Sequence, residues 1–272
     1  MEKWRARMCV RISPVISGIL VIGLTLSPAP VYGAGARKDD GGIAAGGPAT
    51  LWSDPGDLRS RDLFYGPGGP QHEPNGPYTF VKEDLDGTNP KFVVRDRDGM
   101  KWKVKLGVEA RPETVATRLV WAVGYSANED YFLADLRVQN MPVRLHRGQK
   151  LVAPDGSIHN VRLKREDQKK LGDWHWRQDP FTATREWNGL RVLMAMLNNW
   201  DLKDDNNSVY SGADSRQIYM VSDLGASFGT DGPAFPLSKA KGNLASYGRS
   251  KFIRRSTPQT VDFCVPGRPE FL

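Results

Sequence analysis

Two short polar segments in the C-terminal half of the chain carry the residue types that phosphoryl transfer requires. The first is residues 201–207, with the sequence DLKDDNN, and the second is residues 222–225, with the sequence SDLG. A phosphoryl-transfer site neutralises a triphosphate, holds divalent cations with oxygen ligands and orients a hydroxyl nucleophile. Carboxylates, an amide and a lysine are sufficient for these tasks. The candidates are Asp201, Lys203, Asn206 and Asp223.

Each segment alone also has a purely structural interpretation. Asp and Asn side chains often bond their own backbone beyond a helix end, and a D-L-G sequence can simply end a strand. The order of the elements favours a site, because a helix is expected over 185–198 and a strand pair over 208–210 and 217–221 joins the two segments. Asn207 remains an alternative to Asn206 as the inward-pointing amide.

The ordered segments resemble the protein-kinase-like superfamily. The sequence D-L-K-D-D-N matches the catalytic-loop pattern D-L-K-x-x-N, and D-L-G matches the metal-binding D-F-G motif. The spacing of Asp201 and Asn206 is also similar to that in phosphoinositide kinases and HipA-type kinases. No H-R-D precedes the loop and no G-x-G-x-x-G joins the first two strands, so the resemblance, over about residues 78–229, is to the atypical branch that includes secreted and CotH-type kinases.

This resemblance implies a role for each candidate residue. Asp201 would accept or orient the substrate hydroxyl, and Lys203 would lie near the transferred phosphate. Asn206 and Asp223 would bind Mg²⁺ or Mn²⁺, which bridges to the phosphates of ATP.

The resemblance also implies a nucleotide-binding lysine on the third strand and a glutamate on the helix that follows. Lys105 is the first candidate and Lys103 the second. Glu113 is the expected partner in preference to Glu109, which precedes the helix. A structural role for Glu113 is equally compatible with the sequence, because an acidic residue in the first turn stabilises the helix macrodipole.

The elements that must position these residues begin with a three-stranded meander. Strands are expected over 78–82, 92–95 and 100–106, with turns at 86–89 and 98–99. In the third strand Trp102, Val104 and Leu106 alternate with three lysines. The apolar residues are therefore expected to face a core, with Lys101 and Lys103 solvated on the opposite face.

Helices and further strands follow the meander. A helix is expected to begin near Pro112 and to end before Gly124, followed by strands over 131–138 and 158–163. Residues 164–180 are interpreted as a connection whose tryptophans cover a core edge. The next helix has Thr184 as its expected N-cap and a stripe of four apolar residues. These are Trp187, Leu190, Met194 and Leu197.

The expected fold class is α+β with a two-lobed, protein-kinase-like architecture. The β-rich N-lobe would span about residues 78–165. The C-lobe, about residues 166–272, is expected to be mainly helical. It is also expected to be short or truncated, because only 47 residues follow Gly225.

The N-terminal region is interpreted as an export signal followed by a linker. Residues 1–33 combine basic residues with the apolar run 15–26, which is about 18 Å long as a helix and too short to span a bilayer. Cleavage after Ala36 is an alternative to cleavage after Gly33, and a membrane anchor that is not cleaved is another. Residues 34–77 are rich in Gly and Pro, as in a linker or irregular arm. An exported protein, periplasmic or secreted and without a stable membrane span, is expected.

The charge balance does not favour a nucleic-acid partner, and none is expected. The net charge of +7 falls to +4 when the basic N-terminal segment is removed, which is too weak to argue for nucleic-acid binding. The expected function is an exported atypical kinase that transfers the ATP γ-phosphoryl group, with Mg²⁺ or Mn²⁺, to a hydroxyl of a protein, lipid or glycan. The alternatives are a catalytically inactive pseudokinase-type binding module and an enzyme that transfers AMP on the same fold.

Overall fold

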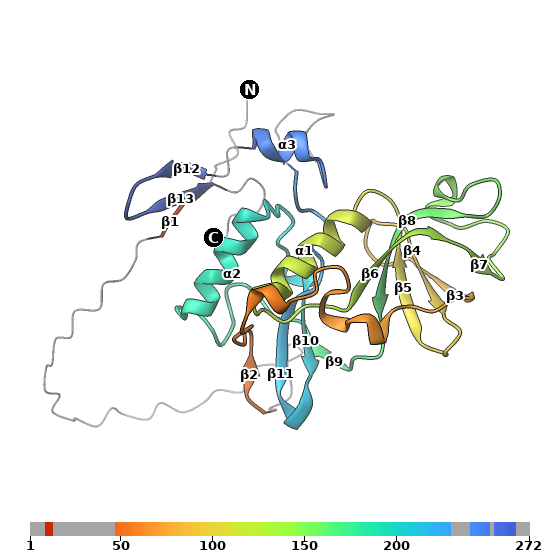
Figure 1. Ribbon diagram of the computed structural model, residues 1–272, viewed down its shortest axis with the longest axis horizontal. Coiled ribbons are helices and arrows are strands. Elements are labelled where there is room, and N and C mark those ends of the chain that lie inside the picture. Colours follow the sequence, from red (N-terminus) through yellow and green to blue (C-terminus); the bar gives the residue numbers. More distant parts are fainter. Residues whose placement is uncertain (1–8, 13–46, 230–239, 251–252, 265–272) are drawn as a thin grey trace, which may run out of the picture.

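The structure is a computed structural model that describes residues 9–12, 47–229, 240–250 and 253–264. Within these residues the chain is α+β, with three sheets and three α-helices (Figure 1). The apolar run expected in the signal peptide lies outside the described residues. No helix in the described ranges has both the length and the apolar character needed to cross a membrane.

The largest sheet has six strands in the order β6-β8-β5-β4-β3-β7. All neighbouring strands are antiparallel except β3 and β7. The expected three-stranded meander is its centre, and it forms a β-rich lobe. The strands are β3 (Tyr78–Asp84), β4 (Lys91–Arg95), β5 (Lys101–Lys105), β6 (Asp130–Leu136), β7 (Val138–Gln139) and β8 (Ile158–Arg165).

The two faces of this sheet differ in chemistry because its side chains alternate. Trp102 and Val104 are buried in the core of the lobe, as expected. Lys101 is exposed on the opposite face, also as expected. The expectation that Lys103 is solvated is wrong. Its Nζ lies 3.1 Å from Asp84 and 3.0 Å from Glu166, because these carboxylates reach the same face from β3 and from the end of β8.

Helix α1 (Ala110–Ala122) lies between this sheet and the rest of the molecule (Figure 1). Glu113 and Thr117 are four residues apart on the side that faces β8 and β6. Ala116 and Val120 are buried in a second core on the neighbouring face. The helix stops before Gly124, which has φ of +97°, and a Cβ there would lie 2.3 Å from the Ser53 carbonyl oxygen.

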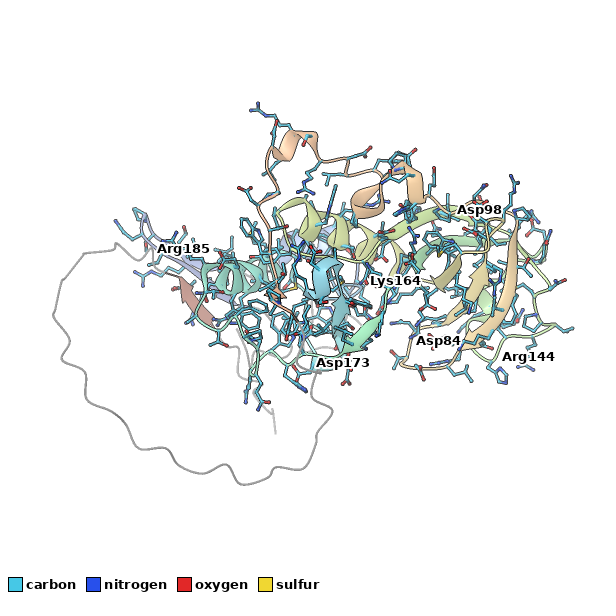
Figure 2. The ribbon with its side chains drawn as sticks, turned by 90° about the horizontal axis from the view of Figure 1, so that it is seen from below. Asp84, Asp98, Arg144, Lys164, Asp173 and Arg185 are labelled. Carbon is cyan, nitrogen blue, oxygen red and sulfur yellow. The ribbon has the colours of Figure 1, made fainter. Side chains whose placement is uncertain are left out.

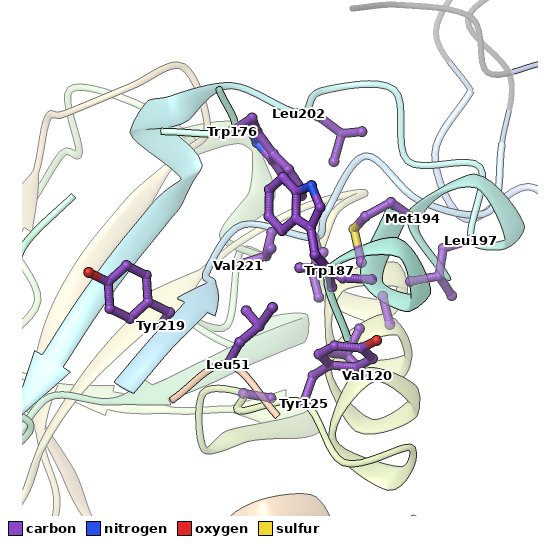
Figure 3. Close-up of a cluster of buried hydrophobic side chains, with 14 of the residues drawn as sticks. Leu51, Val120, Tyr125, Trp176, Trp187, Met194, Leu197, Leu202, Tyr219 and Val221 are labelled. Atoms are coloured by element: carbon purple, nitrogen blue, oxygen red, sulfur yellow. The ribbon is translucent and has the colours of Figure 1, made fainter. Parts of the chain in front are cut away.

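The second core is built around α2 (Arg185–Met196) and a four-stranded sheet in the order β2-β11-β10-β9 (Figure 3). Thr184 caps α2 by accepting a hydrogen bond from the Trp187 backbone N–H at 3.1 Å, as expected. Trp174 and Trp176 are each 2% exposed, so they lie inside this core instead of covering its edge. The strands are β2 (Ala49–Thr50), β9 (Lys170–Gly172), β10 (Asn207–Ser211) and β11 (Gln217–Val221).

The expectation of a mainly helical C-lobe is wrong for the described residues. After residue 166 they contain two α-helices, α2 and the six-residue α3 (Leu244–Arg249), beside five strands. Only α2 has a long apolar stripe at helical spacing, whereas short apolar runs separated by Asn, Asp, Ser and Gly form the strand pair after it.

A third sheet, in the order β1-β13-β12, contains β1 (Cys9–Ile12), β12 (Ile253–Ser256) and β13 (Val261–Cys264).

The described part of the Gly/Pro-rich segment, residues 47–77, is an irregular arm that packs on the body. Its strand β2 pairs in parallel with β11, and Leu51 is 3% exposed within the second core. Three short 3₁₀ turns then lead to β3: Leu58–Ser60, Gly66–Gly68 and Pro70–His72. Figure 2 shows the body from below, with Arg144 in the β-rich lobe and Arg185 at the start of α2 on the opposite side.

Candidate functional site

The ammonium group of Lys105 connects three separate segments of the chain. Its Nζ lies 2.6 Å from Glu113 Oε2, 3.0 Å from Asp223 Oδ1 and 3.2 Å from Glu109 Oε2. The Lys105 side chain is only 3% exposed. The structure therefore brings together the predicted residues Lys105, Glu113 and Asp223.

Simple backbone geometry places these groups at one point. Lys105 is the last residue of β5 and alternates with the buried Val104, so its side chain leaves the sheet on the face covered by α1. Glu113 lies one helical turn after Glu109, which places both carboxylates on one side of the helix. Glu109 was expected to be the less favourable partner, but it also contacts the ammonium because it directly precedes the first helical turn.

Asp223 reaches the site from the opposite side, two residues after the end of β11. Its Oδ1 also accepts a hydrogen bond from the Gly225 backbone N–H at 3.3 Å. A Cβ on Gly225 would lie 2.7 Å from Glu109 Oε2 and 2.9 Å from Glu109 Cβ. The D-L-G turn therefore needs glycine at its third position, because the start of α1 packs directly against it.

Arg162 is a second buried cation that the sequence analysis missed. It lies on β8 directly opposite Lys105, and its Nη2 donates to Glu113 Oε1 at 2.6 Å. Its Nη1 lies 3.7 Å from Asp130 Oδ1, while Thr117 Oγ1 donates to the other carboxylate oxygen of Asp130 at 3.1 Å. No signal in the sequence marks this burial, because alternation places Arg162 on the face opposite Val161 and Leu163, and its partners depend on α1 and on the pairing of β5 with β8.

These contacts set the ionisation of the site. Burial favours the neutral carboxyl of Asp223, but the Lys105 ammonium outweighs it and lowers the pKa of Asp223 to about 2. Burial likewise favours neutral Lys105, but the carboxylates of Glu113 and Asp223 raise the pKa of Lys105 above its ordinary value. Both groups are therefore charged at neutral pH.

The second predicted group of residues lies on the loop after α2. Asp201 and Lys203 form an ion pair with a shortest distance of 2.7 Å, and their side chains are 28% and 38% exposed. The Asn206 amide N–H donates to the Asp201 carbonyl oxygen at 2.5 Å. Asn207 is fully buried and donates to the Trp174 carbonyl oxygen at 3.2 Å, so the geometry favours Asn206 as the residue available to a ligand.

Backbone hydrogen bonds hold this loop beside the D-L-G segment. The Ser222 N–H donates to the Asn206 carbonyl oxygen at 2.7 Å, and the Trp200 N–H donates to the Ala226 carbonyl oxygen at 3.4 Å. Residues on both sides of Asp201 are thus bonded to residues on both sides of Asp223. The two polar segments predicted from the sequence are neighbours, joined by the β10–β11 hairpin.

Comparison of the chain with protein-family models, with curated proteins and with solved structures finds no match.

The possible positions for a divalent cation depend on which side-chain oxygens are already engaged in other contacts. Oxygens of Glu109, Glu113 and Asp223 lie within 4.8 Å of one another, but the Lys105 ammonium contacts all three and takes the place of a cation there. The described contacts of Asp223 all use Oδ1, and its side chain is 38% exposed, which leaves Oδ2 for an incoming ligand. Asn206 donates through its side-chain nitrogen, which leaves its side-chain Oδ1 as a metal ligand.

The pKa of Asp223 leads to a prediction for acid stability. An unfolded aspartate has a pKa of about 3.9, so the stabilisation by ionised Asp223 is present above about pH 4 and is lost as the pH falls towards 2. The difference in free energy of unfolding between the wild type and Asp223→Asn should be constant from pH 5 to 7 and shrink from pH 4 to 2. Urea unfolding at each pH measures it. A difference that did not change below pH 4 would contradict the assigned ion pair.

Proposed function

We propose that this protein is an atypical kinase, which transfers the γ-phosphoryl group of ATP to a hydroxyl group of a protein, lipid or glycan. The observation that carries the proposal is the convergence of Lys105, Glu113 and Asp223 from a strand, a helix and a post-hairpin turn. Their order along the chain, with the loop 201–206 before the hairpin, is the order that the kinase-like motifs require.

Each residue has a task that its surroundings support. Lys105, held by Glu113, would bind the phosphates of the nucleotide. Asp223 Oδ2 and the side-chain Oδ1 of Asn206 would hold Mg²⁺ or Mn²⁺, which would neutralise charge on the phosphates. Asp201 would accept the proton of the acceptor hydroxyl, and Lys203, paired with Asp201, would lie next to the transferred group.

A kinase-like fold is part of this proposal. The β-rich lobe, the helix α1 packed on it and the second core on the other side of α1 agree with a two-lobed arrangement. Export of the protein is also proposed, from the basic and apolar N-terminal sequence alone.

Ligand-dependent stabilisation tests the proposal. ATP with Mg²⁺ or Mn²⁺ at a hundredfold excess over its Kd should stabilise the wild-type protein by about 2.7 kcal/mol, measured as a rise in Tm. Asp223→Asn should remove most of this stabilisation because it removes a charged metal ligand. Asp205→Asn, an exposed aspartate of the same loop, is the matched control and should respond like the wild type.

The outcomes separate the alternatives. No rise in Tm with wild-type protein would refute nucleotide binding and with it the kinase. An equal rise in Asp223→Asn would favour a binding module that does not use the metal. Label transferred from γ-labelled ATP supports a kinase, whereas label from α-labelled ATP would indicate AMP transfer.

A further inference from the structure

Lys91 is a lysine of the β-rich lobe whose charge is poorly compensated. It is the first residue of β4 and pairs directly with Lys105 of β5, so two ammonium groups occupy neighbouring positions on the same face. Like charges directly opposite each other in a sheet are destabilising unless other groups neutralise them. Lys105 has three carboxylates within 3.2 Å. Lys91 has no such arrangement.

Among the described residues, the only ion pair of Lys91 is with Asp84 Oδ2, at 3.8 Å, which is too long for a hydrogen bond. The same oxygen lies 3.1 Å from Lys103, so it is already engaged by a nearer cation. The Lys91 side chain is only 18% exposed. Burial lowers the pKa of Lys91, although the Asp84 carboxylate opposes that effect.

The position of Lys91 relates it to the candidate site. Its Nζ lies 3.9 Å from where a Cβ on Gly87 would be, at the turn between β3 and β4. The Arg147 guanidinium fixes this turn by donating to the carbonyl oxygens of Gly87 and Asp84. Lys91 is thus a partly buried ammonium held next to a fixed turn, on the face of the sheet where Lys105 meets Asp223.

We propose that Lys91 and Lys105 form a subsite for the phosphate chain of the nucleotide, beside the turn over residues 85–89. The inference rests on the proposed function for the identity of the ligand, and it explains how the chain binds phosphates without a glycine-rich loop. A phosphate oxygen supplies the charge-assisted hydrogen bond that Lys91 lacks. It also relieves the repulsion between the two ammonium groups.

Binding to two probes tests the subsite in the full-length protein. The probes are ATP with Mg²⁺, and tripolyphosphate without metal, each measured by calorimetry. Lys91→Met should weaken binding of both by about tenfold or more, because it removes a hydrogen bond to a charged group. Lys91→Arg keeps the charge and should retain most of the affinity. Lys101→Met is the matched control, since Lys101 lies exposed on β5, and it should bind both probes like the wild type.

The result that overturns the proposal is equal binding of both probes by the wild type and Lys91→Met. An equal loss in Lys101→Met would also overturn it, since the effect would then be one of overall charge. Loss of tripolyphosphate binding in Lys91→Met supports the subsite even if the wild type fails to bind ATP, in which case only the kinase proposal falls. If the wild type binds ATP but not tripolyphosphate and Lys91→Met leaves ATP binding unchanged, the kinase proposal stands and the subsite falls. Circular dichroism of each variant confirms that it is folded.

Discussion

Arg162→Met is expected to lower the free energy of unfolding by about 3–5 kcal/mol, the cost of breaking a buried ion pair from one side. Arg162 is 3% exposed, and its guanidinium contacts Glu113 and Asp130, which are both fully buried. Methionine fills much of the same volume but provides no charge. Among the described residues, Asp130 would keep its hydrogen bond from Thr117, and Glu113 would keep its contact with Lys105. Urea unfolding at pH 7 measures the loss.

An exposed ion pair provides the control for this experiment. Arg137 and Asp155 approach to 2.5 Å, but their side chains are 68% and 56% exposed. Arg137→Met should therefore lower the free energy of unfolding far less than Arg162→Met, as is usual for surface pairs. If both arginine variants lost the same small amount, Arg162 would not neutralise the carboxylates as the structure indicates.

A double-mutant cycle measures the coupling between Arg162 and Glu113. Combining Arg162→Met with Glu113→Gln should cost less than the sum of the two single changes, because the glutamine no longer needs the guanidinium. A coupling free energy of about 1 kcal/mol or more is expected for groups in direct contact. Additive effects would contradict the contact.

Much of the β-rich lobe could be predicted because its signals are local. Turns at 86–89 and 98–99 separate strands with clear alternation, and the observed β3, β4 and β5 correspond to the three that were expected. The helix α1 was also marked at both ends, by Pro112 and Gly124. Signals of this kind need no knowledge of the tertiary structure.

The rest could not be predicted because it depends on pairing between distant segments. Arg162 acquires its role only when β8 pairs with β5, and the sequence does not state that register. Lys103 has the same alternation as Lys105, and only the positions of Asp84 and Glu166 separate their environments. The tryptophans of residues 174–176 lie in a segment with little periodicity, so their burial depends on α2 and β11.

The candidate site shows the same division. The motifs selected Asp201, Asn206 and Asp223, and the hairpin between them correctly predicted that their segments are neighbours. The site also contains two charges that no motif names, Asp130 and Arg162, together with Glu109, which the sequence placed second to Glu113. These groups determine how Lys105 and Glu113 are held, so they affect the site through its geometry and electrostatics.

Asp201→Asn is expected to lower the rate of phosphoryl transfer by about 10²–10⁴-fold, the usual contribution of a general base. Asparagine has nearly the same shape as aspartate but cannot accept the hydroxyl proton. The bond from the Asp201 N–H to Asn199 and the bond from Asn206 to the Asp201 carbonyl oxygen use the backbone of residue 201, so the loop should keep its conformation. Release of label from γ-labelled ATP, with water as acceptor, measures the rate without a known substrate.

ATP binding must be measured as well as the rate of phosphoryl transfer, because the two measurements together distinguish a role in catalysis from a role in binding the nucleotide. Asp201→Asn should bind ATP with Mg²⁺ about as well as the wild type, since Asp201 contacts Lys203 rather than the residues around Lys105. Lys203→Met removes that ion pair and is expected to slow transfer although the Asp201 carboxyl group is still present. If Asp201→Asn transferred phosphate at the wild-type rate, the base would have to be a different group. A loss of ATP binding in Asp201→Asn would instead place Asp201 among the ligands of the nucleotide, and the general-base assignment would be wrong.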